Sequence, residues 1–408
     1  MDTGDTAWVL VASALVLFMT PGLALFYGGM VRSKNVLAML MQNFFAMGIV
    51  TVLWVLIGYT LAFGDAGNGG VIGNFDFAGL KGLTNGVSGT IPTLAFVAFQ
   101  LTFAVITPAL ITGAIADRMR WVAWVGFITA WSLLVYLPVA HWVFAGGWLA
   151  KRGALDFAGG TVVHVNAGAG ALALILLLGK RRGWPQEPMP PHSLPLTLLG
   201  TGILWFGWFG FNAGSALAAN GVAAQAFLNT FVAAASGMLG WLIVERGKAG
   251  HATTLGAASG AVAGLVAITP CAGFVGGLAP VAIGLAAGVV CFLAISLKFR
   301  FGYDDSLDVV AVHLVGGVLG SLLLGFFADT SVNEAGTDGV FFGGGWGLFG
   351  EQLLAVVVVL AFSFVVSGLI GIVLREALPR GIRASDEEEI TGLDLTQHSE
   401  TGYSLERA

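Results

Sequence analysis

The chain has 408 residues, of which 57% are hydrophobic and only 10% are charged. An ordinary soluble domain carries about 25% charged residues, so this composition excludes a soluble enzyme, a nucleic-acid-binding protein and a disordered scaffold. The net charge of -5 says little by itself, because the placement of the charges matters more than their sum. The composition therefore predicts a protein that uses the lipid bilayer as part of its solvent.

Eleven apolar segments are long enough to cross a bilayer as helices, which takes about 20 residues. Their continuous apolar runs favour helices over the alternating strands of a β-barrel. The predicted spans are residues 7–31, 37–62, 91–115, 121–142, 160–179, 194–216, 222–244, 253–270, 275–297, 309–328 and 350–374. The expected fold class is an all-α polytopic membrane protein with eleven transmembrane helices.

Basic residues are distributed unequally between the two sides of these spans. Fifteen of the 18 Lys and Arg residues lie in the loops after spans 1, 3, 5, 7 and 9 or in the C-terminal segment. Cytoplasmic loops carry an excess of Lys and Arg, so we expect the N-terminus outside the cell and the C-terminus in the cytoplasm. The expected location is the cell membrane, inner or plasma.

The composition changes sharply after Arg383. An acidic run begins at Asp386 and is followed by mostly polar residues. This change divides the chain into a transmembrane domain, residues 1–383, and an acidic cytoplasmic tail, residues 384–408. We expect a tail of this composition to be flexible when it is alone, and it is either a solvated end or a docking segment for a partner.

A short internal repeat brings two histidines into equivalent positions. Seven residues separate Asp156 from His164, and seven separate Asp305 from His313; a glycine follows each histidine four residues later. The histidines lie in spans 5 and 10, the last spans of two five-helix halves. Five spans per half invert the second half relative to the first, and binding sites of such inverted repeats lie near the bilayer midplane. We therefore expect the two histidines to meet inside the protein.

Ionisable residues inside a membrane are costly and are candidates for function. His164 and His313 are the deep titratable groups that we predict, and burial keeps both rings neutral. Such a pair can line a path for a proton or substrate, ligate a haem iron or bind a metal. A metal site usually needs further ligands; haem ligation is harder to exclude, but it needs a wide gap between helices, whereas Gly168 and Gly317 indicate a close approach. We therefore expect no metal and no cofactor.

Aromatic residues precede the histidines at helical spacing. Phe99 and Phe103 share a helix face in span 3, as do Phe211 and Ser215 in span 6. Phenylalanines in membrane helices mostly fill space or face lipid. An aromatic face can also hold a small cation before it is dehydrated, and a serine can accept a hydrogen bond from that cation.

Asp156 precedes the histidine of span 5 at the start of the predicted helix. The simpler interpretation is an N-cap, which satisfies free amides and suits the helix dipole. The alternative is electrostatic support, over a longer range, for a cation near the outer mouth of a pathway.

The motifs around these residues are similar to those of the ammonium transporter family (Amt/Mep/Rh), in its bacterial Amt type. The resemblance covers nearly the whole chain, including the tail segment "GLDLTQHSETGYS". It is carried by "ALFYGGMVRSKN" (Ala24–Asn35), "ITPALITGAIADR" (Ile106–Arg118), "DFAGGTVVHVNAG" (Asp156–Gly168), "WFGWFGFNAGSA" (Trp205–Ala216) and "DVVAVHLVGG" (Asp308–Gly317).

This resemblance implies a transporter and not an enzyme: an eleven-span homotrimer with pseudo-two-fold symmetry and one pore per subunit. Ammonium would be recruited outside, deprotonated and conducted through a hydrophobic pore. A PII-type signal protein, often called GlnK, would bind at the tail from the cytoplasm. The implied site comprises the pore histidines His164 and His313, the gating phenylalanines Phe103 and Phe211, the recruitment residues Phe99, Phe144 and Ser215, and the supporting acid Asp156.

The chain departs from the family at one position of the outer site. The family usually has a Trp in a segment resembling "HWVWGG", whereas this chain reads "HWVFAGG" with Phe144 there. Phenylalanine has a weaker cation–π surface than tryptophan and no N–H group. The departure puts the strength of ammonium recruitment in doubt.

Two other functions stay open from the sequence. The first is an ammonium sensor that passes its occupancy through the tail to a partner. The second is a membrane redox subunit in which the two histidines ligate haem.

Overall fold

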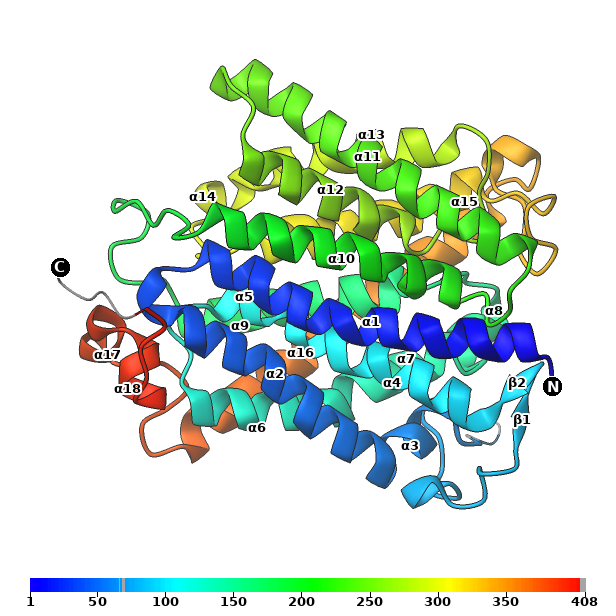
Figure 1. Ribbon diagram of the computed structural model, residues 1–408, viewed down its shortest axis with the longest axis horizontal. Coiled ribbons are helices and arrows are strands. Elements are labelled where there is room, and N and C mark those ends of the chain that lie inside the picture. The colour runs from blue at the N-terminus through cyan, green and yellow to red at the C-terminus, as the bar shows by residue number, and fades with distance from the viewer. Residues whose placement is uncertain (66, 68–69, 404–408) are drawn as a thin grey trace.

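The computed structural model describes residues 1–65, 67 and 70–403, and most of them are helical (Figure 1). The α-helices are α1 (Thr3–Met30), α2 (Val36–Leu53), α3 (Tyr59–Phe63), α4 (Thr93–Leu110), α5 (Thr112–Ile115), α6 (Trp121–Trp131), α7 (Leu137–Val143), α8 (Trp148–Arg152), α9 (Asn166–Leu178), α10 (Leu194–Gly214), α11 (Gly221–Ala249), α12 (Thr254–Ile268), α13 (Ala279–Ala294), α14 (Ser296–Phe301), α15 (Gly316–Phe327), α16 (Gly347–Ala377), α17 (Asp386–Thr391) and α18 (Leu393–His398).

Short π-helical turns interrupt several of the long helices. These turns are η2 (Trp54–Gly58), η4 (Ser132–Tyr136), η5 (Gly160–Val165) and η6 (Val310–Val315). Three 3-10 turns, η1 (Ser33–Asn35), η3 (Ala78–Leu80) and η7 (Val340–Phe342), lie in or beside loops. The strands β1 (Val87–Ser88) and β2 (Ile91–Pro92) form one antiparallel hairpin, in which Val87 pairs with Pro92. Because π-turns are frequent at functional sites, η5 and η6 are the first places to look for one.

Ten helical segments of the described chain are long and apolar enough to cross a membrane. They are Thr3–Met30, Ser33–Phe63, Thr93–Ile115, Trp121–Arg152, Gly160–Leu178, Leu194–Gly214, Gly221–Ala249, Ala279–Phe301, Val310–Phe327 and Gly347–Ala377. The shorter apolar helix Thr254–Ile268 matches the predicted span 253–270. The N- and C-terminal ends of the chain lie at opposite ends of the bundle (Figure 1), which is consistent with the predicted odd count of eleven.

The short helix α12 is held against α11 by its small residues. A Cβ added to Gly260 would lie 2.6 Å from the Cβ of Trp241, and one added to Gly237 would lie 2.7 Å from the Cα of Gly264. These backbones approach so closely because glycine has no side chain. Gly260 and Gly264, which are four residues apart in α12, therefore serve the packing of this helix against α11.

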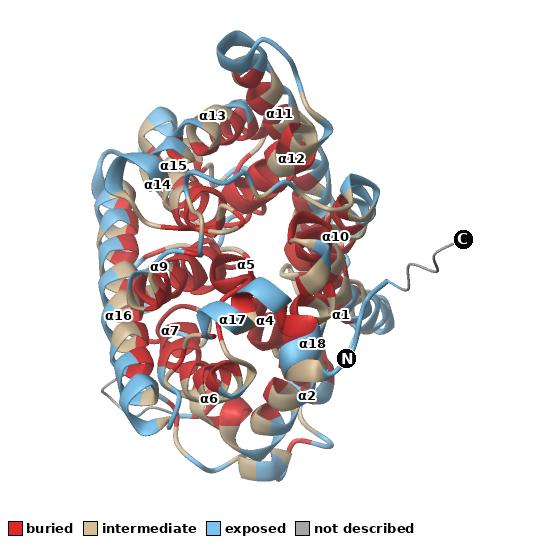
Figure 2. Cartoon of the chain, turned by 90° about the vertical axis from the view of Figure 1, so that its left-hand side faces the viewer, coloured by how far each residue is buried: buried red, intermediate tan, exposed pale blue. Residues whose placement is uncertain are grey.

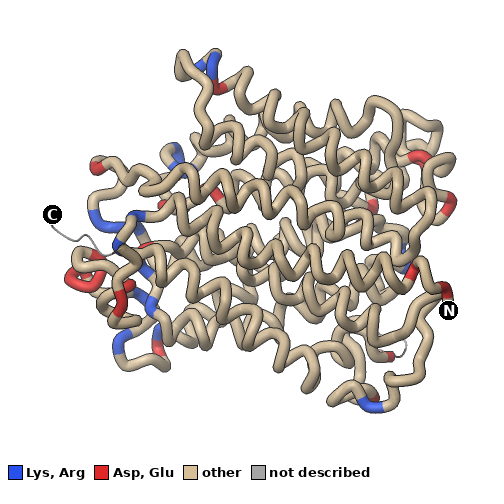
Figure 3. Tube along the Cα trace, viewed as in Figure 1, with Lys and Arg blue, Asp and Glu red and all other residues tan. Residues whose placement is uncertain are grey.

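Charged residues gather at the two ends of the bundle, and its middle is almost free of them (Figure 3). Lys and Arg are concentrated at the end that carries the C-terminus, which we call the C-terminal end. Seen from this end, the helix faces that meet inside the bundle are buried and the outer faces are exposed (Figure 2). The exposed outer faces carry large apolar side chains such as Phe206, Ile243 and Val373, as a lipid-facing surface requires.

Residues 384–403 of the tail, which we expect to be flexible when alone, are folded against the bundle in this structure. Helices α17 and α18 fold against the C-terminal end of the bundle (Figures 1 and 2). Asp394 accepts hydrogen bonds from the backbone amides of Leu37 and Ala38, at 3.0 and 2.8 Å, and Asn35 accepts one from the amide of Leu393. The tail is ordered because its polar side chains accept hydrogen bonds from free backbone amides at the start of α2. Residues 404–408 of the predicted tail lie outside the described part of the chain.

Candidate functional site

His164 and His313 meet in the middle of the bundle, as their positions in the repeat predict. Their Nδ1 atoms are 3.2 Å apart, and their rings are nearly parallel, with centroids 5.3 Å apart. Both side chains are buried. The distance between the two nitrogens fits a shared N–H···N hydrogen bond.

Each histidine lies in a π-helical turn that an aspartate caps. Asp156 accepts hydrogen bonds from the amides of Gly159, Gly160 and Thr161 at the start of η5, at 2.6–2.8 Å. Asp305 accepts one from Val310 at the start of η6, at 2.7 Å. Burial raises the pKa of Asp156, while these hydrogen bonds favour its charged form. The N-cap interpretation of Asp156 therefore agrees with the observed contacts.

The two glycines of the repeat place the histidine turns against each other. A Cβ added to Gly168 would lie 2.6 Å from the backbone nitrogen of Leu314, next to His313. A Cβ added to Gly317 would lie 3.0 Å from the Cβ of His164. Each glycine thus makes room for the turn that carries the other histidine, and this reciprocal packing agrees with an inverted repeat.

The hydrogen bonds around the pair assign the tautomer of each ring. The hydroxyl of Tyr27 donates to the carbonyl of Leu110 at 3.2 Å, and its oxygen lies 3.4 Å from Nε2 of His313. Because the hydroxyl proton of Tyr27 is used in that bond, the Tyr27 oxygen accepts a hydrogen bond from Nε2–H of His313. The Nδ1 of His313 then carries no proton and accepts a hydrogen bond from the Nδ1–H of His164. Nε2 of His164 is then an acceptor; it is buried and has no partner among the described residues.

The two histidines line a narrow cavity. The space inside it that is open to a water-sized molecule is about 10 Å³, close to what one such molecule needs. His164 and His313 both line it, and the rest of the lining is apolar: Met19, Leu23, Phe26, Ile106, Leu110, Val163, Leu204, Trp208, Phe211 and Val262. The cavity therefore offers a small polar molecule one nitrogen acceptor in an otherwise dry wall.

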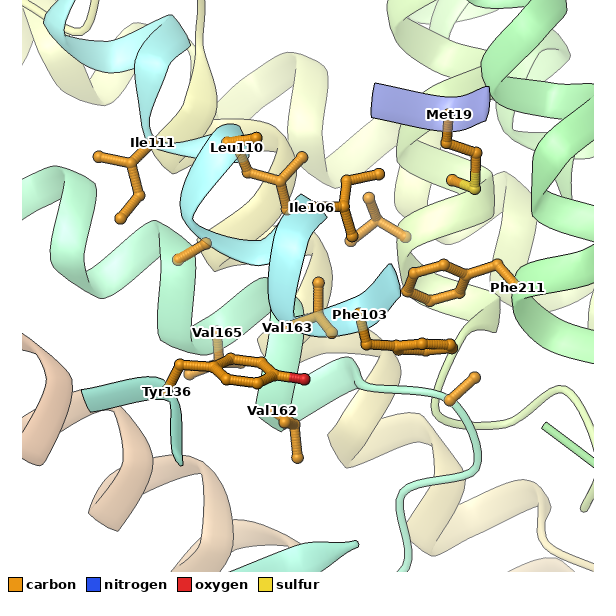
Figure 4. Packing of buried hydrophobic residues seen from close by; sticks show 14 of the residues in the cluster. Met19, Phe103, Ile106, Leu110, Ile111, Tyr136, Val162, Val163, Val165 and Phe211 are labelled. Atoms are coloured by element: carbon orange, nitrogen blue, oxygen red, sulfur yellow. The ribbon is translucent and has the colours of Figure 1, made fainter. Parts of the chain in front are cut away.

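Phe103 and Phe211 stack on each other beside the cavity (Figure 4). Their ring centroids are 4.3 Å apart with an interplanar angle of 29°. Phe211 lies 6.2 Å from the ring of His164. Both phenylalanines are buried, so a molecule that reaches His164 from this side has to displace or pass the stacked pair.

The predicted recruitment residues Phe99, Phe144 and Ser215 all contact this stack. Phe99 lies 5.0 Å from the ring of Phe103, and Phe144 meets Phe103 edge to face at 6.2 Å. Ser215 donates its hydroxyl proton to the carbonyl of Phe211 at 2.8 Å. Because that proton is used, the hydroxyl oxygen of Ser215 is left as an acceptor.

Two residues that contact the histidine pair were not predicted from the sequence. Trp208 stacks on His164 with ring centroids 5.5 Å apart, and its Nε1 donates to Thr269. Tyr27 contacts His313 from α1. The spacing of three residues between Trp208 and Phe211 could have indicated a shared helix face, whereas no local pattern relates Tyr27 to a histidine 286 residues away.

Comparison with known proteins decides the family. The sequence model of the Ammonium Transporter Family matches residues 7–403. The chain is 53% identical to the ammonium transporter of Mycobacterium bovis, covering 99% of this chain and 91% of that one. It is 51% identical to the ammonium transporter of Bacillus subtilis, covering 99% of both. The chain belongs to the ammonium transporter family.

Solved structures of this family share the fold. The crystal structure of Candida albicans Mep2 matches with a TM-score of 0.88 at 36% identity, over 95% of this chain and 88% of that chain. A structure titled Sensor Amt Protein matches with a TM-score of 0.88 at 30% identity, over 97% of this chain and 98% of that chain. The family and the fold show that this protein is a multi-pass membrane transporter and not an enzyme.

Proposed function

We propose that this protein carries ammonium across the cell membrane by recruiting the cation, removing its proton and conducting ammonia past the histidine pair. The N-terminus is outside the cell and the C-terminal end faces the cytoplasm, because Lys and Arg concentrate at that end (Figure 3). The proposal rests on one observation above all: Nε2 of His164 is buried without a partner among the described residues, and His164 lines a cavity of the size of one small molecule.

Desolvation explains why the proton has to leave. Moving a bare ion into a medium of low dielectric constant costs on the order of 20 kcal/mol in the idealised limit. The lining of the cavity contains no carboxylate to offset that cost. Ammonium can lose a proton and enter as neutral ammonia, whereas potassium cannot. The apolar lining of the cavity therefore admits ammonia and excludes potassium.

The order of events follows the order of the residues. Phe99 and Phe144 offer aromatic faces to the cation, and the oxygen of Ser215 accepts one of its hydrogen bonds. Asp156 supports this outer site with its negative charge. The molecule then passes Phe103 and Phe211 and reaches Nε2 of His164, which accepts a hydrogen bond from it. Nε2 of His164 can take the proton that ammonium loses while the Nδ1 proton of His164 moves to Nδ1 of His313, so the shared hydrogen bond gives the proton a route of its own.

Transport by purified protein in proteoliposomes tests this proposal. An ammonium gradient is expected to drive flux, and an equal potassium gradient is expected to drive none. Charge-sensitive recording of the same vesicles then reports whether the proton follows. A current that depends on ammonium supports electrogenic transport, while flux without current supports a neutral ammonia pathway. Potassium flux equal to ammonium flux contradicts the deprotonation step.

A sensor is the second candidate function. The similarity to a structure titled Sensor Amt Protein and the ordered tail both favour a protein that reports its occupancy. Ammonium binding without flux in the same proteoliposomes would support a sensor and contradict the transporter.

The proposal also includes the assembly. We propose a homotrimer with one pore per subunit, and a PII-type protein (GlnK) that binds the cytoplasmic face where α17 and α18 lie. Native mass spectrometry is expected to show three copies of the 42.1 kDa chain. Addition of the PII-type protein is expected to add its mass to that complex and to slow ammonium flux. A monomer that transports at the full rate contradicts the trimer.

A further inference from the structure

The first turn of α1 lies at the end of the bundle opposite to the C-terminal end, beside the β1–β2 hairpin (Figure 1). The backbone amide of Asp2 donates to the carbonyl of Thr90 in that hairpin at 2.7 Å. The side chain of Asp2 accepts from the amide of Asp5 at 2.9 Å and so caps the helix. These contacts hold Asp5 next to the hairpin.

The two carboxylate oxygens of Asp5 bind two different segments of the chain. One oxygen accepts a hydrogen bond from the hydroxyl of Thr90, three residues before α4 begins. The other accepts from the backbone amide of Ala219 at 2.8 Å, in the turn that follows α10. We call these two contacts the outer bridge. Trp8 supports it from the next turn of α1, because its Nε1–H donates to the carbonyl of Ala213 at 3.2 Å.

The two segments joined by the outer bridge carry two sides of the proposed recruitment site. Phe99 lies in α4, and Ser215 caps the end of α10, four residues before Ala219. The two sides touch, since a Cβ added to Gly214 would lie 2.8 Å from Cε2 of Phe99. A movement of the turn after α10 relative to α4 therefore changes the space between the Phe99 ring and the Ser215 hydroxyl.

The turn after α10 is strained as well as bridged. Leu217, between Ser215 and Ala219, has a φ of 55°. A residue with a branched side chain adopts this left-handed conformation at a cost and keeps it only where the surroundings hold it. Since a strained turn relaxes when an anchor is removed, the hydrogen bond from Ala219 to Asp5 keeps Ser215 in its position.

We propose that Asp5 is a positioning residue of the ammonium recruitment site. Its carboxylate joins the segment that enters α4 to the turn that leaves α10, and it thereby fixes the Ser215 acceptor against the Phe99 ring. This inference rests on the proposed recruitment of ammonium by these two residues. It assigns no contact between Asp5 and ammonium, so the site requires the outer bridge and not the negative charge itself.

Flux at graded ammonium concentrations in proteoliposomes tests the outer bridge. Asp5→Ala removes both acceptors and is expected to raise the ammonium concentration for half-maximal transport about fivefold, or about 1 kcal/mol, which is the size of one lost hydrogen bond. The maximal rate should change little, because the gate and the histidines are untouched. Asp5→Asn should stay close to the parent protein, because its amide oxygen accepts from Ala219 and its amide nitrogen donates to the Thr90 hydroxyl.

Three further variants separate the outer bridge from other effects of Asp5. Thr90→Val removes one bridge contact without touching α1 and should raise the half-maximal concentration less than Asp5→Ala does. Glu334→Ala removes a negative charge from an exposed position in the loop between α15 and α16, and should leave that concentration unchanged. Ser215→Ala should raise it, and adding Asp5→Ala should raise it no further, because the bridge acts through Ser215.

Hydrogen exchange of residues 213–221 measures the turn without transport, and it should be faster in Asp5→Ala than in Asp5→Asn. The proposal is overturned by an unchanged half-maximal concentration in Asp5→Ala, by an equal loss in Asp5→Asn or Glu334→Ala, or by additive effects of Asp5→Ala and Ser215→Ala. An unchanged concentration in Ser215→Ala contradicts recruitment at Ser215 and, with it, the inference that depends on it, whereas faster exchange in Asp5→Ala would still show that the bridge holds the turn.

Discussion

Polar side chains are buried both at the centre of the bundle and at its C-terminal end, but they are hydrogen-bonded differently in the two regions. At the centre, two neutral rings share one hydrogen bond and leave Nε2 of His164 without a partner among the described residues. At the C-terminal end, Arg181 binds both carboxylate oxygens of Asp304, at 2.8 and 2.9 Å, and lies 3.7 Å from Asp117. One region keeps an acceptor free, and the other neutralises its charges in place.

The difference separates a pathway from a scaffold. A buried polar atom without a partner costs about 1–3 kcal/mol, and in the mechanism that we propose a passing molecule supplies the missing hydrogen bond at the centre. Buried charges cost more and must be paired, so those at the C-terminal end cannot also serve a moving substrate. Variants in the two regions should therefore fail in different ways, the first in transport and the second in stability.

The largest expected effect is in the histidine pair. His164→Ala combined with His313→Ala should lower selective ammonium flux in proteoliposomes more than tenfold, because no acceptor remains in the dry cavity. The thermal unfolding midpoint should change little by comparison. His251→Ala, at an exposed position, is the control and should transport normally. Selective transport at the original rate by the double variant would contradict the role assigned to the histidines.

The next effect is in the buried ion pair. Asp304→Asn removes the charge that Arg181 needs and should lower the free energy of unfolding by about 3–5 kcal/mol. The matched control is Glu351→Gln, whose partner Arg152 is 52% exposed, and surface pairs of this kind contribute about 0–1 kcal/mol. Unfolding in detergent, followed by circular dichroism, measures both. Equal losses in the two variants would show that burial does not distinguish these regions.

A pH dependence should arise between the two regions, at Asp305. Burial and the neighbouring Asp308 raise the pKa of this carboxyl to about 7, against an opposing effect of Lys298. The folded state therefore binds a proton that the unfolded state releases at lower pH. From pH 3.8 to about 7, the free energy of unfolding should fall as the pH rises.

Asp305→Asn tests this assignment. The amide oxygen still accepts from Val310, while the amide nitrogen takes the place of Asp305 Oδ1, which is buried without a partner in the described chain. The unfolding midpoint of the variant should depend less on pH across this window than that of the parent protein. Asp386→Asn, whose side chain is 73% exposed, should leave the pH profile unchanged. An unchanged profile in Asp305→Asn would refute the assignment.

The arrangement of the residues at the centre was largely predictable because the sequence contains an internal repeat. The equal spacing from Asp156 to His164 and from Asp305 to His313 indicated the meeting of the two rings, and the helical spacing of Phe99 and Phe103 indicated a shared face. Their contacts in the fold bear out both of these arrangements. Their roles in recruitment and gating stay predictions.

The C-terminal end was not predictable in the same way. Its contacts join residues far apart in the chain, such as Leu393 and Asn35, and no periodicity relates them. An acidic polar segment has the composition of a disordered tail, and its folding depends on contacts with the bundle, such as those with the amides at the start of α2 and the ion pair of Glu388 with Arg120. Sequence patterns report local geometry and repeats, whereas these contacts depend on where loops meet in space.

The smallest expected effect concerns Phe144, where the chain departs from its family. Phe144→Trp should strengthen the cation–π contact by about 0.5–1 kcal/mol and lower the ammonium concentration for half-maximal transport about two- to fivefold. Phe144 is only half-buried, so the larger ring can be accommodated. Phe206→Trp, at a 56% exposed position, should leave that concentration unchanged. Because the outer site acts before deprotonation, a change in maximal rate alone would place Phe144 with the gate and not with recruitment.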